Sequence, residues 1–361
     1  MPSLDPPGGL IPERPDQLTP AWLATVFTRH GFSAAIESID FRPIEGGGLT
    51  SELLRVVPRV QDETTGFAPP LIWKRSSADA TARASFQRGY EAEVEFYRAI
   101  APRSGVAVPR SFVAAYEERT GAHVLVLEDL SASMSSGLMR EVAVEEAAAV
   151  LDELARLHAS EWATSGALQA AEDFARLRPF VEEHAAAGRP YLSEHVDDRV
   201  RQRTRRYADE VAGYFAALSA GPQTRTHGDV HPDNVLLPHS GNANSGDARP
   251  VLIDWQGSRI DAPMRDVARF LVLALTVEDR REHEDELLDH YLATLGHHGA
   301  HYDRDAAARD FRTASLLQWG WAVIFFRHEP IWDTGTREAM PSLVRRAAAA
   351  FDDAITSRGK S

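Results

Sequence analysis

The 361-residue chain contains no cysteine, so it can form no disulfide, carry no thiolate nucleophile and bind no zinc ion through cysteine. It also lacks an uninterrupted run of about 18 apolar residues, the length that a transmembrane helix needs. Residues 1–14 contain proline and glycine but no apolar stretch of signal-peptide length. The absence of these two kinds of apolar segment predicts a cytoplasmic protein that does not enter a membrane, whereas the absence of cysteine does not indicate the compartment.

Net positive charge is also lacking. Lysine and arginine number 39 against 53 aspartates and glutamates, which gives a formal net charge of −14. An acidic chain gains nothing from displacing the counterions of a nucleic acid, so DNA and RNA are poor candidate partners. Lysine itself is scarce, because Lys74 is the only one before the carboxy-terminal tail. A lone lysine in the chain body is a candidate for a dedicated role.

Two kinds of pattern follow one another along the chain. Apolar residues make up 43% of it, and its length suits two lobes. The first third is rich in strand-like segments. It opens with a proline-rich arm and a predicted helix that begins at Thr19-Pro20 and ends at Gly31, and a second helical pattern lies near residues 85–100. Helical patterns dominate later, around a strand-and-loop island at 223–256. The sequence predicts an α+β protein, with a small lobe of antiparallel strands over 1–128 and a larger helical lobe over 129–361.

A short polar segment stands between apolar stretches in the second half of the chain. It reads His227-Gly228-Asp229-Val230-His231-Pro232-Asp233-Asn234. The apolar run 235–237 follows, and a second run, 251–253, leads into Asp254. A lone His-Gly-Asp would be an ordinary turn, but this spacing matches the kinase template H-R-D-x-x-x-x-N with a later D-F-G. The match favours a catalytic loop over a structural turn.

Each part of that template has a chemical task in phosphoryl transfer. A carboxylate orients the attacking hydroxyl group and takes its proton, which suits Asp229. Magnesium prefers a few oxygen ligands and keeps several waters, which suits Asn234 and Asp254. We therefore expect Asp229 to be catalytic, and Asn234 and Asp254 to bind a magnesium ion.

Lys74 ends a predicted strand, where a lysine can restrain the α- and β-phosphates of a nucleotide. The alternative is a solvated lysine at a strand end. A phosphate-binding lysine needs a carboxylate to fix it, and Glu91, Glu93 and Glu95 on the next helical segment compete for that place. Glu93 follows Tyr90 by three residues and so shares its apolar helix face. Glu93 is therefore the predicted partner, while the other two glutamates face water.

A glycine-rich segment, Gly46-Gly47-Gly48-Leu49-Thr50-Ser51, lies between two strand-like stretches ahead of Lys74. Glycines let backbone N–H groups approach phosphates, and Thr50 or Ser51 can add a hydroxyl group. Two interpretations stay open. The segment is either a flexible hairpin or a phosphate-binding loop that uses Gly47, Gly48, Thr50 and Ser51.

Taken together, these motifs resemble the aminoglycoside phosphotransferase and choline kinase superfamily, and within it the bacterial relatives of the ecdysteroid-kinase-like group. The resemblance rests on the segments 227–234, Asp254-Trp255-Gln256, Asp266-Val267-Ala268-Arg269 and Leu154-Ala155-Arg156-Leu157-His158-Ala159. It implies a protein-kinase-like, two-lobed fold with the nucleotide between the lobes. It also implies ATP and Mg²⁺ as cofactors and the hydroxyl group of a small molecule as acceptor.

The same resemblance implies two further roles. The adenine base should lie against the linker at 128–130, which makes Glu128 and Leu130 predicted cofactor-binding residues. Asp266 should hold the catalytic loop from the next helix.

The sequence departs from the protein-kinase pattern after Asp254, because Gln256 stands where D-F-G has its glycine and no A-P-E follows. Without a long activation segment, a protein kinase is the weaker alternative. A catalytically silent nucleotide-binding module is another alternative. It would have no need to keep Lys74, Asp229 and Asn234 together.

The segment 318–332 is unusually aromatic and holds three of the chain's seven tryptophans. Helical spacing places Trp319 and Phe326 on one face, and Trp321 and Phe325 on a nearly opposite one. Packed core is the alternative for each of them, but both faces cannot pack the same core. We predict that the face of Trp319 and Phe326 contacts the acceptor.

This segment has only one carboxylate, which is too few for the several ammonium groups of an aminoglycoside. Aromatic faces suit apolar rings, sugars or a single quaternary ammonium. We therefore expect an apolar alcohol, a sugar or a choline-like acceptor. The choice between ATP and GTP and the oligomeric state stay open.

Overall fold

The structure is a computed structural model, and it describes residues 2–33, 35–44, 51–61, 68–137, 141–163, 198–239, 249–325 and 334–358. The chain falls into two compact units. Unit 1 comprises Met1–Arg103, Val108–Met134 and Ile253–Ser258, and unit 2 comprises Ser104–Ala107, Ser135–Leu252 and Arg259–Ser361. The short segment Ile253–Ser258 therefore belongs to unit 1, although its neighbours in sequence belong to unit 2.

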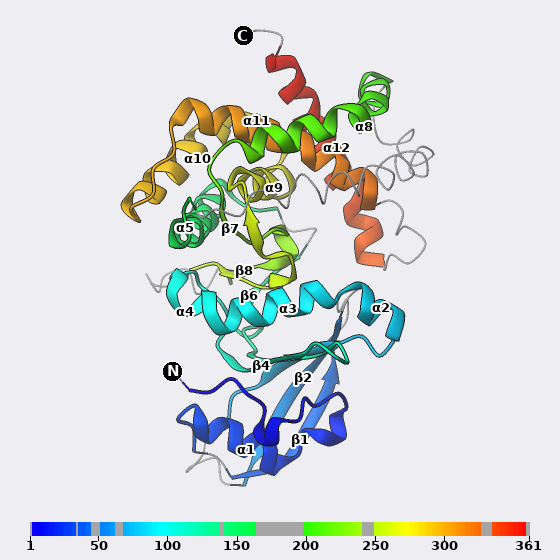
Figure 1. The fold of residues 1–361 in the computed structure, drawn as a ribbon, viewed down its shortest axis with the longest axis vertical. Coiled ribbons are helices and arrows are strands. Elements are labelled where there is room, and N and C mark those ends of the chain that lie inside the picture. The colour runs from blue at the N-terminus through cyan, green and yellow to red at the C-terminus, as the bar shows by residue number, and fades with distance from the viewer. Residues whose placement is uncertain are drawn as a thin grey trace. The chain divides into compact units, whose positions relative to one another are not determined.

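Unit 1 is built on a five-stranded antiparallel sheet in the order β1-β2-β3-β5-β4 (Figure 1). Its strands are β1 (Ile36–Pro43), β2 (Ser51–Val60), β3 (Leu71–Ser76), β4 (Ser111–Glu117) and β5 (Ala122–Glu128). Its helices are α1 (Pro20–Arg29), α2 (Ala80–Ser85) and α3 (Gln87–Glu95), which continues through the π-helical turn Phe96–Ile100 into α4 (Ala101–Ser104). Short 3-10 turns are Pro7–Gly9, Pro15–Gln17 and Trp255–Gly257.

Helix α1 covers one face of this sheet. The side chain of Thr19 accepts a hydrogen bond from Trp22 N, and Pro20 occupies the first helical position, so the start of the helix is well specified. Its buried residues join a core cluster that includes Trp73 of β3. Because successive strand residues point to opposite faces, Lys74 faces away from α1. The alternation along β3 thus places Lys74 on the side of α3, where it contacts Glu93. Figure 1 shows α1 and α3 on opposite sides of the sheet.

Unit 2 is mostly helical. Its helices are α5 (Val144–Ser160), α8 (Asp198–Ser219), α9 (Met264–Ala274), α10 (Val277–His297), α11 (Arg304–Phe325) and α12 (Thr334–Arg358). Its short strands are β7 (Thr224–Thr226), β8 (Val235–Pro238), β9 (Val251–Leu252) and β10 (Arg259–Asp261), with a 3-10 turn at Pro232–Asn234 and β6 (Met134–Ser135) at the junction of the units. Strand β8 pairs with β9, and β10 pairs with β7, both antiparallel.

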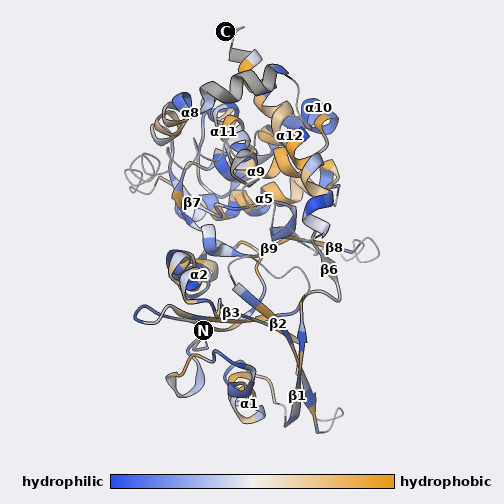
Figure 2. Ribbon diagram, turned by 90° about the vertical axis from the view of Figure 1, so that its right-hand side faces the viewer, coloured by the Kyte–Doolittle hydropathy of each residue, from blue (hydrophilic) through white to orange (hydrophobic). Residues whose placement is uncertain are grey.

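Helix α9 is the centre of unit 2. Every residue of α9 except Arg265 is buried, and the helix packs against α5, α10, α11 and α12. Figure 2 shows apolar residues gathered around α5, α9 and α12. None of the described helices is long and apolar enough to cross a membrane.

Helices α8 and α11 approach closely at Gly320. The hydroxyl group of Tyr207 on α8 donates a hydrogen bond to the carbonyl of Leu317 on α11, at 3.4 Å. A Cβ atom at Gly320 would lie only 2.6 Å from Cζ of the buried Tyr207 ring. Gly320 therefore leaves the space that Tyr207 fills.

We expect Gly320→Ala to lower the free energy of unfolding by about 1–3 kcal/mol, the usual cost of overpacking. This would occur although alanine favours a helix over glycine by about 1 kcal/mol. Gly213→Ala on α8 is the matched control, since nothing lies within 4 Å of the added Cβ there. Urea unfolding measures both variants. A Gly320→Ala protein as stable as Gly213→Ala would contradict this packing.

Candidate active site

Lys74 of β3 is held between two carboxylates of unit 1. Its Nζ lies 2.8 Å from Oε1 of Glu93 on α3 and 2.8 Å from Oδ1 of Asp254. The Lys74 side chain is only 8% exposed. Burial alone would lower the pKa of Lys74, but Asp254 and Glu93 outweigh it and raise that pKa above its ordinary value. Lys74 therefore carries a fixed positive charge.

Glu93 is the glutamate that the structure brings to Lys74, as the sequence predicts, whereas Glu91 and Glu95 are exposed. Burial by itself would raise the pKa of Glu93. The charge of Lys74 and the neighbouring His123 outweigh burial and hold that pKa below its ordinary value. Glu93 is thus an ionised partner for the lysine.

His123 is a part of this site that sequence reasoning missed. It is fully buried on β5, and its ring stacks on Tyr90 with a centroid separation of 4.9 Å. Its Nε2 lies 3.5 Å from Oε2 of Glu93, while burial lowers its pKa and favours the neutral ring. Tyr90 and Glu93 lie one helical turn apart, so one face of α3 contacts both His123 and Lys74.

The segment that carries Asp254 is fixed to unit 1 by several contacts. The ring of Trp255 stacks on Phe96 at a centroid distance of 3.5 Å, and its backbone N–H donates to Glu93 Oε1 at 3.3 Å. The Gln256 amide donates to Ser51 Oγ at 2.9 Å. Asp254 itself has φ 61° and ψ 73°, in the left-handed region that few non-glycine residues adopt. Such backbone strain persists where its surroundings enforce it, and it is found mostly at functional sites.

The predicted phosphate-binding loop is described only at its end. Gly47, Gly48 and Thr50 lie outside the described residues. Ser51 is buried at the start of β2 and accepts the hydrogen bond from Gln256. Its contact with a phosphate stays a prediction.

The predicted adenine-binding linker follows β5. The N–H of Glu128 donates to the carbonyl of Arg110 at 2.9 Å, and the carbonyl of Leu130 accepts from the N–H groups of Ser133 and Met134, each at 3.0 Å. These bonds fix the course of the linker backbone. A nucleotide contact at Glu128 or Leu130 stays a prediction.

Asp229 and Asn234 share one loop of unit 2. The Asn234 side-chain nitrogen donates to the backbone carbonyl of Asp229 at 2.9 Å and lies 3.2 Å from Nε2 of His231. Since the amide nitrogen is engaged with a carbonyl, the amide oxygen is the atom that can bind a cation. The Asp229 side chain is 43% exposed, so its carboxylate is accessible.

Asp266 braces this loop from the first turn of α9. Its carboxylate accepts hydrogen bonds from the backbone N–H groups of His227, at 2.6 Å, and Gly228, at 2.9 Å. Gly228 has φ 81°, which suits glycine. His158 of α5 lies 3.3 Å from the same carboxylate and 2.8 Å from the hydroxyl of Tyr291. Asp266 thus occupies the bracing position that the resemblance implies.

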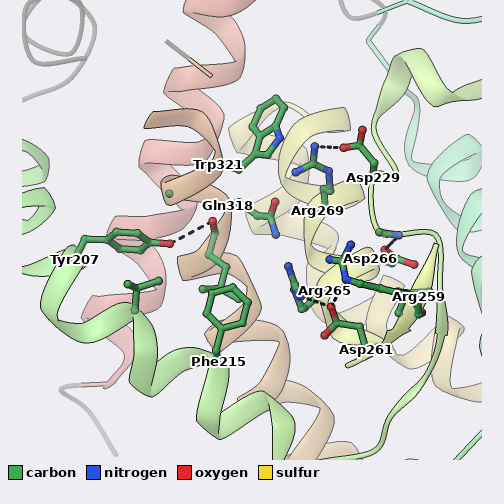
Figure 3. Close-up of a pocket in the computed structure, with 15 residues that line it drawn as sticks. Tyr207, Phe215, Asp229, Arg259, Asp261, Arg265, Asp266, Arg269, Gln318 and Trp321 are labelled. Atoms are coloured by element: carbon green, nitrogen blue, oxygen red, sulfur yellow. Dashed lines mark hydrogen bonds and ion pairs between the residues drawn. The ribbon is translucent and has the colours of Figure 1, made fainter. Parts of the chain in front are cut away.

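Arg269, one turn further along α9, forms an ion pair with Asp229 (Figure 3). Its guanidinium lies 4.3 Å from the ring centroid of Trp321 on α11. Burial alone would raise the pKa of Asp229, but Arg269, with His231 and His227, outweighs it and lowers that pKa. Sequence reasoning assigned Arg269 no role, although its three-residue spacing from Asp266 places both on one helix face.

Asp229 lines a cavity of about 260 Å³ that lies within unit 2 (Figure 3). The walls are aromatic and apolar side chains from α8 and α11, and charged side chains from β10 and α9. The lining residues are Tyr207, Val211, Phe215, Thr226, Gly228, Asp229, Arg259, Asp261, Arg265, Asp266, Arg269, Leu317, Gln318, Gly320 and Trp321.

The structure separates the two predicted faces of α11 and places Trp321, not Trp319, at this cavity. Trp319 is fully buried, its ring packs on Phe351 of α12 at a centroid distance of 5.7 Å, and it is not among the residues that line this cavity. Trp321 lines the cavity instead. Helical spacing separates the two faces correctly but does not reveal which neighbour each face meets. Phe326 lies outside the described residues.

We expect Arg269→Gln to raise the pKa of Asp229, because the variant removes the strongest charge that stabilises the carboxylate. Carbon-13 NMR titration of the aspartate carboxyl groups measures this pKa. The titration midpoint should move to higher pH in Arg269→Gln and stay near that of the original protein in Arg269→Lys, which keeps the positive charge. An unchanged midpoint in Arg269→Gln would show that the ion pair does not set the pKa.

Solved structures of other proteins resemble this chain, and two of them have a TM-score of 0.50. A choline/ethanolamine kinase family protein from Mesorhizobium loti is 17% identical, over 94% of this chain and 98% of that one. Choline kinase from Cryptosporidium parvum Iowa II is 11% identical, over 89% of each chain. At such identities the likeness concerns the fold, and it confirms the predicted protein-kinase-like α+β fold.

A search of curated proteins found no match. The model of the ecdysteroid kinase-like family matches residues 45–303, which is well over half of the sequence. The resemblance read from the motifs is therefore confirmed, and the chain belongs to the ecdysteroid kinase-like family.

Proposed function

We propose that this protein is a phosphotransferase that moves the γ-phosphoryl group of ATP, bound with Mg²⁺, to a hydroxyl group of a small molecule. The observation that carries the proposal is the buried Lys74, which contacts Glu93 and Asp254 at 2.8 Å each. A lysine on the third strand that pairs with a helix glutamate is the arrangement with which kinases restrain the α- and β-phosphates. The names of the family and of its structural neighbours refer to kinases, which supports the same class.

The chemistry assigned to unit 2 depends on the ionised state of Asp229. The acceptor oxygen forms a new bond to the γ-phosphorus, the bond from that phosphorus to ADP breaks, and the hydroxyl proton passes to Asp229. Arg269 forms an ion pair with the carboxylate and lowers its pKa, which favours the ionised form. Asp266 holds the backbone of the loop through His227 and Gly228. Positioning and fixed charge are the main sources of rate in such a reaction.

Asn234 and Asp254 are the residues proposed to hold magnesium. An amide oxygen and a carboxylate are ligands that Mg²⁺ prefers, and a nucleotide-bound Mg²⁺ needs only one or two protein ligands beside phosphate oxygens and water. When bound, the ion neutralises charge on the phosphates.

The cavity beside Asp229 argues against a polycationic acceptor. Each of its carboxylates is already engaged, Asp229 with Arg269, Asp261 with two arginines, and Asp266 with backbone N–H groups. Several ammonium groups would therefore meet no unpaired carboxylate among these three. This supports the expectation that an aminoglycoside is not the acceptor.

The expectation of a choline-like acceptor receives no such support. Two of the three aromatic rings that line the cavity, those of Trp321 and Phe215, already lie beside guanidinium groups. Arg269 lies over Trp321, and Arg265 lies 4.9 Å from the ring centroid of Phe215. Apolar alcohols and sugars therefore remain the preferred classes of acceptor.

Asp229→Asn tests the function against the alternative of a silent nucleotide-binding module. The variant cannot take the hydroxyl proton, so turnover should fall by about 10²- to 10⁴-fold while ATP affinity stays nearly constant. ADP release in the presence of an accepted alcohol measures turnover, and calorimetry measures affinity. The control is Asp285→Asn, which changes a carboxylate that is 86% exposed on α10. Near-normal turnover of Asp229→Asn would remove Asp229 from the mechanism.

A further inference from the structure

Each oxygen atom of the Asp229 carboxylate has a basic side chain close to it. Arg269 of α9 forms an ion pair with Oδ1, and Nε2 of His231, on the same loop as Asp229, lies 3.8 Å from Oδ2. Both of these neighbours contact the same side chain of α11. The guanidinium carbon of Arg269 lies 4.3 Å from the ring centroid of Trp321, and the His231 ring lies 6.4 Å from the Trp321 ring, centroid to centroid. One indole ring therefore supports the groups on both sides of the carboxylate.

The guanidinium group of Arg269 depends on this ring for its orientation. The Arg269 side chain is only 8% exposed, and it donates to Asp229 through Nη2. Among the described residues, its Nε has no hydrogen-bond partner. An ion pair through one nitrogen lets a guanidinium turn about that contact, whereas an aromatic ring against its face restricts the turn. Figure 3 shows Arg269 between Trp321 and Asp229, where the indole can hold the guanidinium toward the carboxylate.

Direct contact with the acceptor is the alternative role for Trp321, since this residue also lines the cavity beside Asp229. The two roles differ in what the indole touches. Its contacts with Arg269 and His231 both lead to the same carboxylate, one to each oxygen atom. This convergence favours a role in the position of the carboxylate.

We propose that Trp321 is a positioning residue, whose indole ring holds Arg269 and His231 in place and through them fixes the direction of the Asp229 carboxylate. That this carboxylate acts on a phosphoryl acceptor rests on the proposed function. A catalytic group displaced by about 1 Å can lower a rate by about 10²-fold, so loss of the ring lowers turnover. Because the ring acts on the carboxylate and not on the acceptor, the loss affects every acceptor alike.

The first test measures the stacking by NMR and needs no nucleotide. A proton above the face of an aromatic ring is shifted upfield by the ring current. The Nε–H signal of Arg269, assigned by its loss in Arg269→Lys, should be shifted upfield in the original protein. The shift should disappear in Trp321→Leu, and Trp321→Phe should retain part of it because it keeps an aromatic face.

Trp162→Leu is the matched control for this test. It makes the same substitution in unit 2, at a tryptophan that packs on Tyr302 and is not among the residues that line the cavity. The Nε–H signal of Arg269 should keep its upfield shift in this variant.

The second test separates positioning from acceptor binding by kinetics. ADP release is measured with MgATP and whichever of cyclohexanol, D-glucose and choline the protein phosphorylates. Trp321→Leu keeps an apolar cavity wall, so the KM of the alcohol should stay nearly constant while kcat falls by about 10- to 10²-fold. Trp321→Phe should recover part of kcat. Because Trp321 acts partly through Arg269, Trp321→Leu should lower kcat less in an Arg269→Gln background than it does alone.

Three results would overturn the proposal. They are an Arg269 Nε–H signal without an upfield shift in the original protein, an unchanged kcat in Trp321→Leu, and a loss in Trp321→Leu that lies in the KM of the alcohol, which would make Trp321 an acceptor-binding residue. The first of these does not depend on how Trp321→Leu folds. A ring-shifted signal in a protein that phosphorylates no alcohol would refute only the proposed function, and phosphoryl transfer that Trp321→Leu leaves unchanged would refute only the positioning role.

Discussion

A buried ammonium group keeps its charge only when carboxylates lie close to it, and the arrangement of unit 1 depends on this requirement at Lys74. Glu93 and Asp254 supply the carboxylates, from a helix and from a segment 180 residues further along the chain. The stacking of Trp255 on Phe96 holds that segment in place, and the strained backbone of Asp254 is retained there. Removal of Lys74 would leave the buried Glu93 without its ammonium partner, and removal of either carboxylate would leave the buried ammonium group with only one.

In unit 2 the buried charge is negative, and hydrogen-bond donors surround it. Asp266 is a buried carboxylate that accepts hydrogen bonds from backbone N–H groups of the loop that carries Asp229, so a shift of this loop would break those bonds. One turn along α9, Arg269 controls the charge of Asp229. Helix α9 thus fixes both the backbone and the side chain of the loop.

Local patterns were enough to predict much of this site. Glu93 could be chosen from three glutamates because helical periodicity separates a buried face from two exposed positions. The antiparallel sheet and the position of Lys74 on a strand also followed from local alternation of residue types. The spacing from Asp229 to Asn234 matched a known template, so their shared loop was expected.

Periodicity and motif spacing could not predict which segments that are distant in the sequence pack together. Periodicity divides the aromatic residues of α11 between two faces, but only the positions of α9 and α12 decide that Trp321 meets the cavity and Trp319 the core. The ion pair of Arg269 with Asp229 depends on how α9 approaches the loop. The role of His123 could not be predicted, because no local pattern shows that β5 lies against α3. The pairing of two arginines with Asp261 likewise arises from the three-dimensional arrangement of β10 and α9.

Transfer of phosphate to an alcohol is the central claim, and phosphorus-31 NMR tests it most directly. The protein would be incubated with ATP, with and without Mg²⁺, and with a panel of apolar alcohols, sugars, hydroxy acids, choline and an aminoglycoside. A small-molecule phosphotransferase gives ADP and a new phosphate-ester signal that require both magnesium and one alcohol of the panel. Binding of ATP with no ester from any alcohol, or phosphate found only on added protein, would contradict the proposed function.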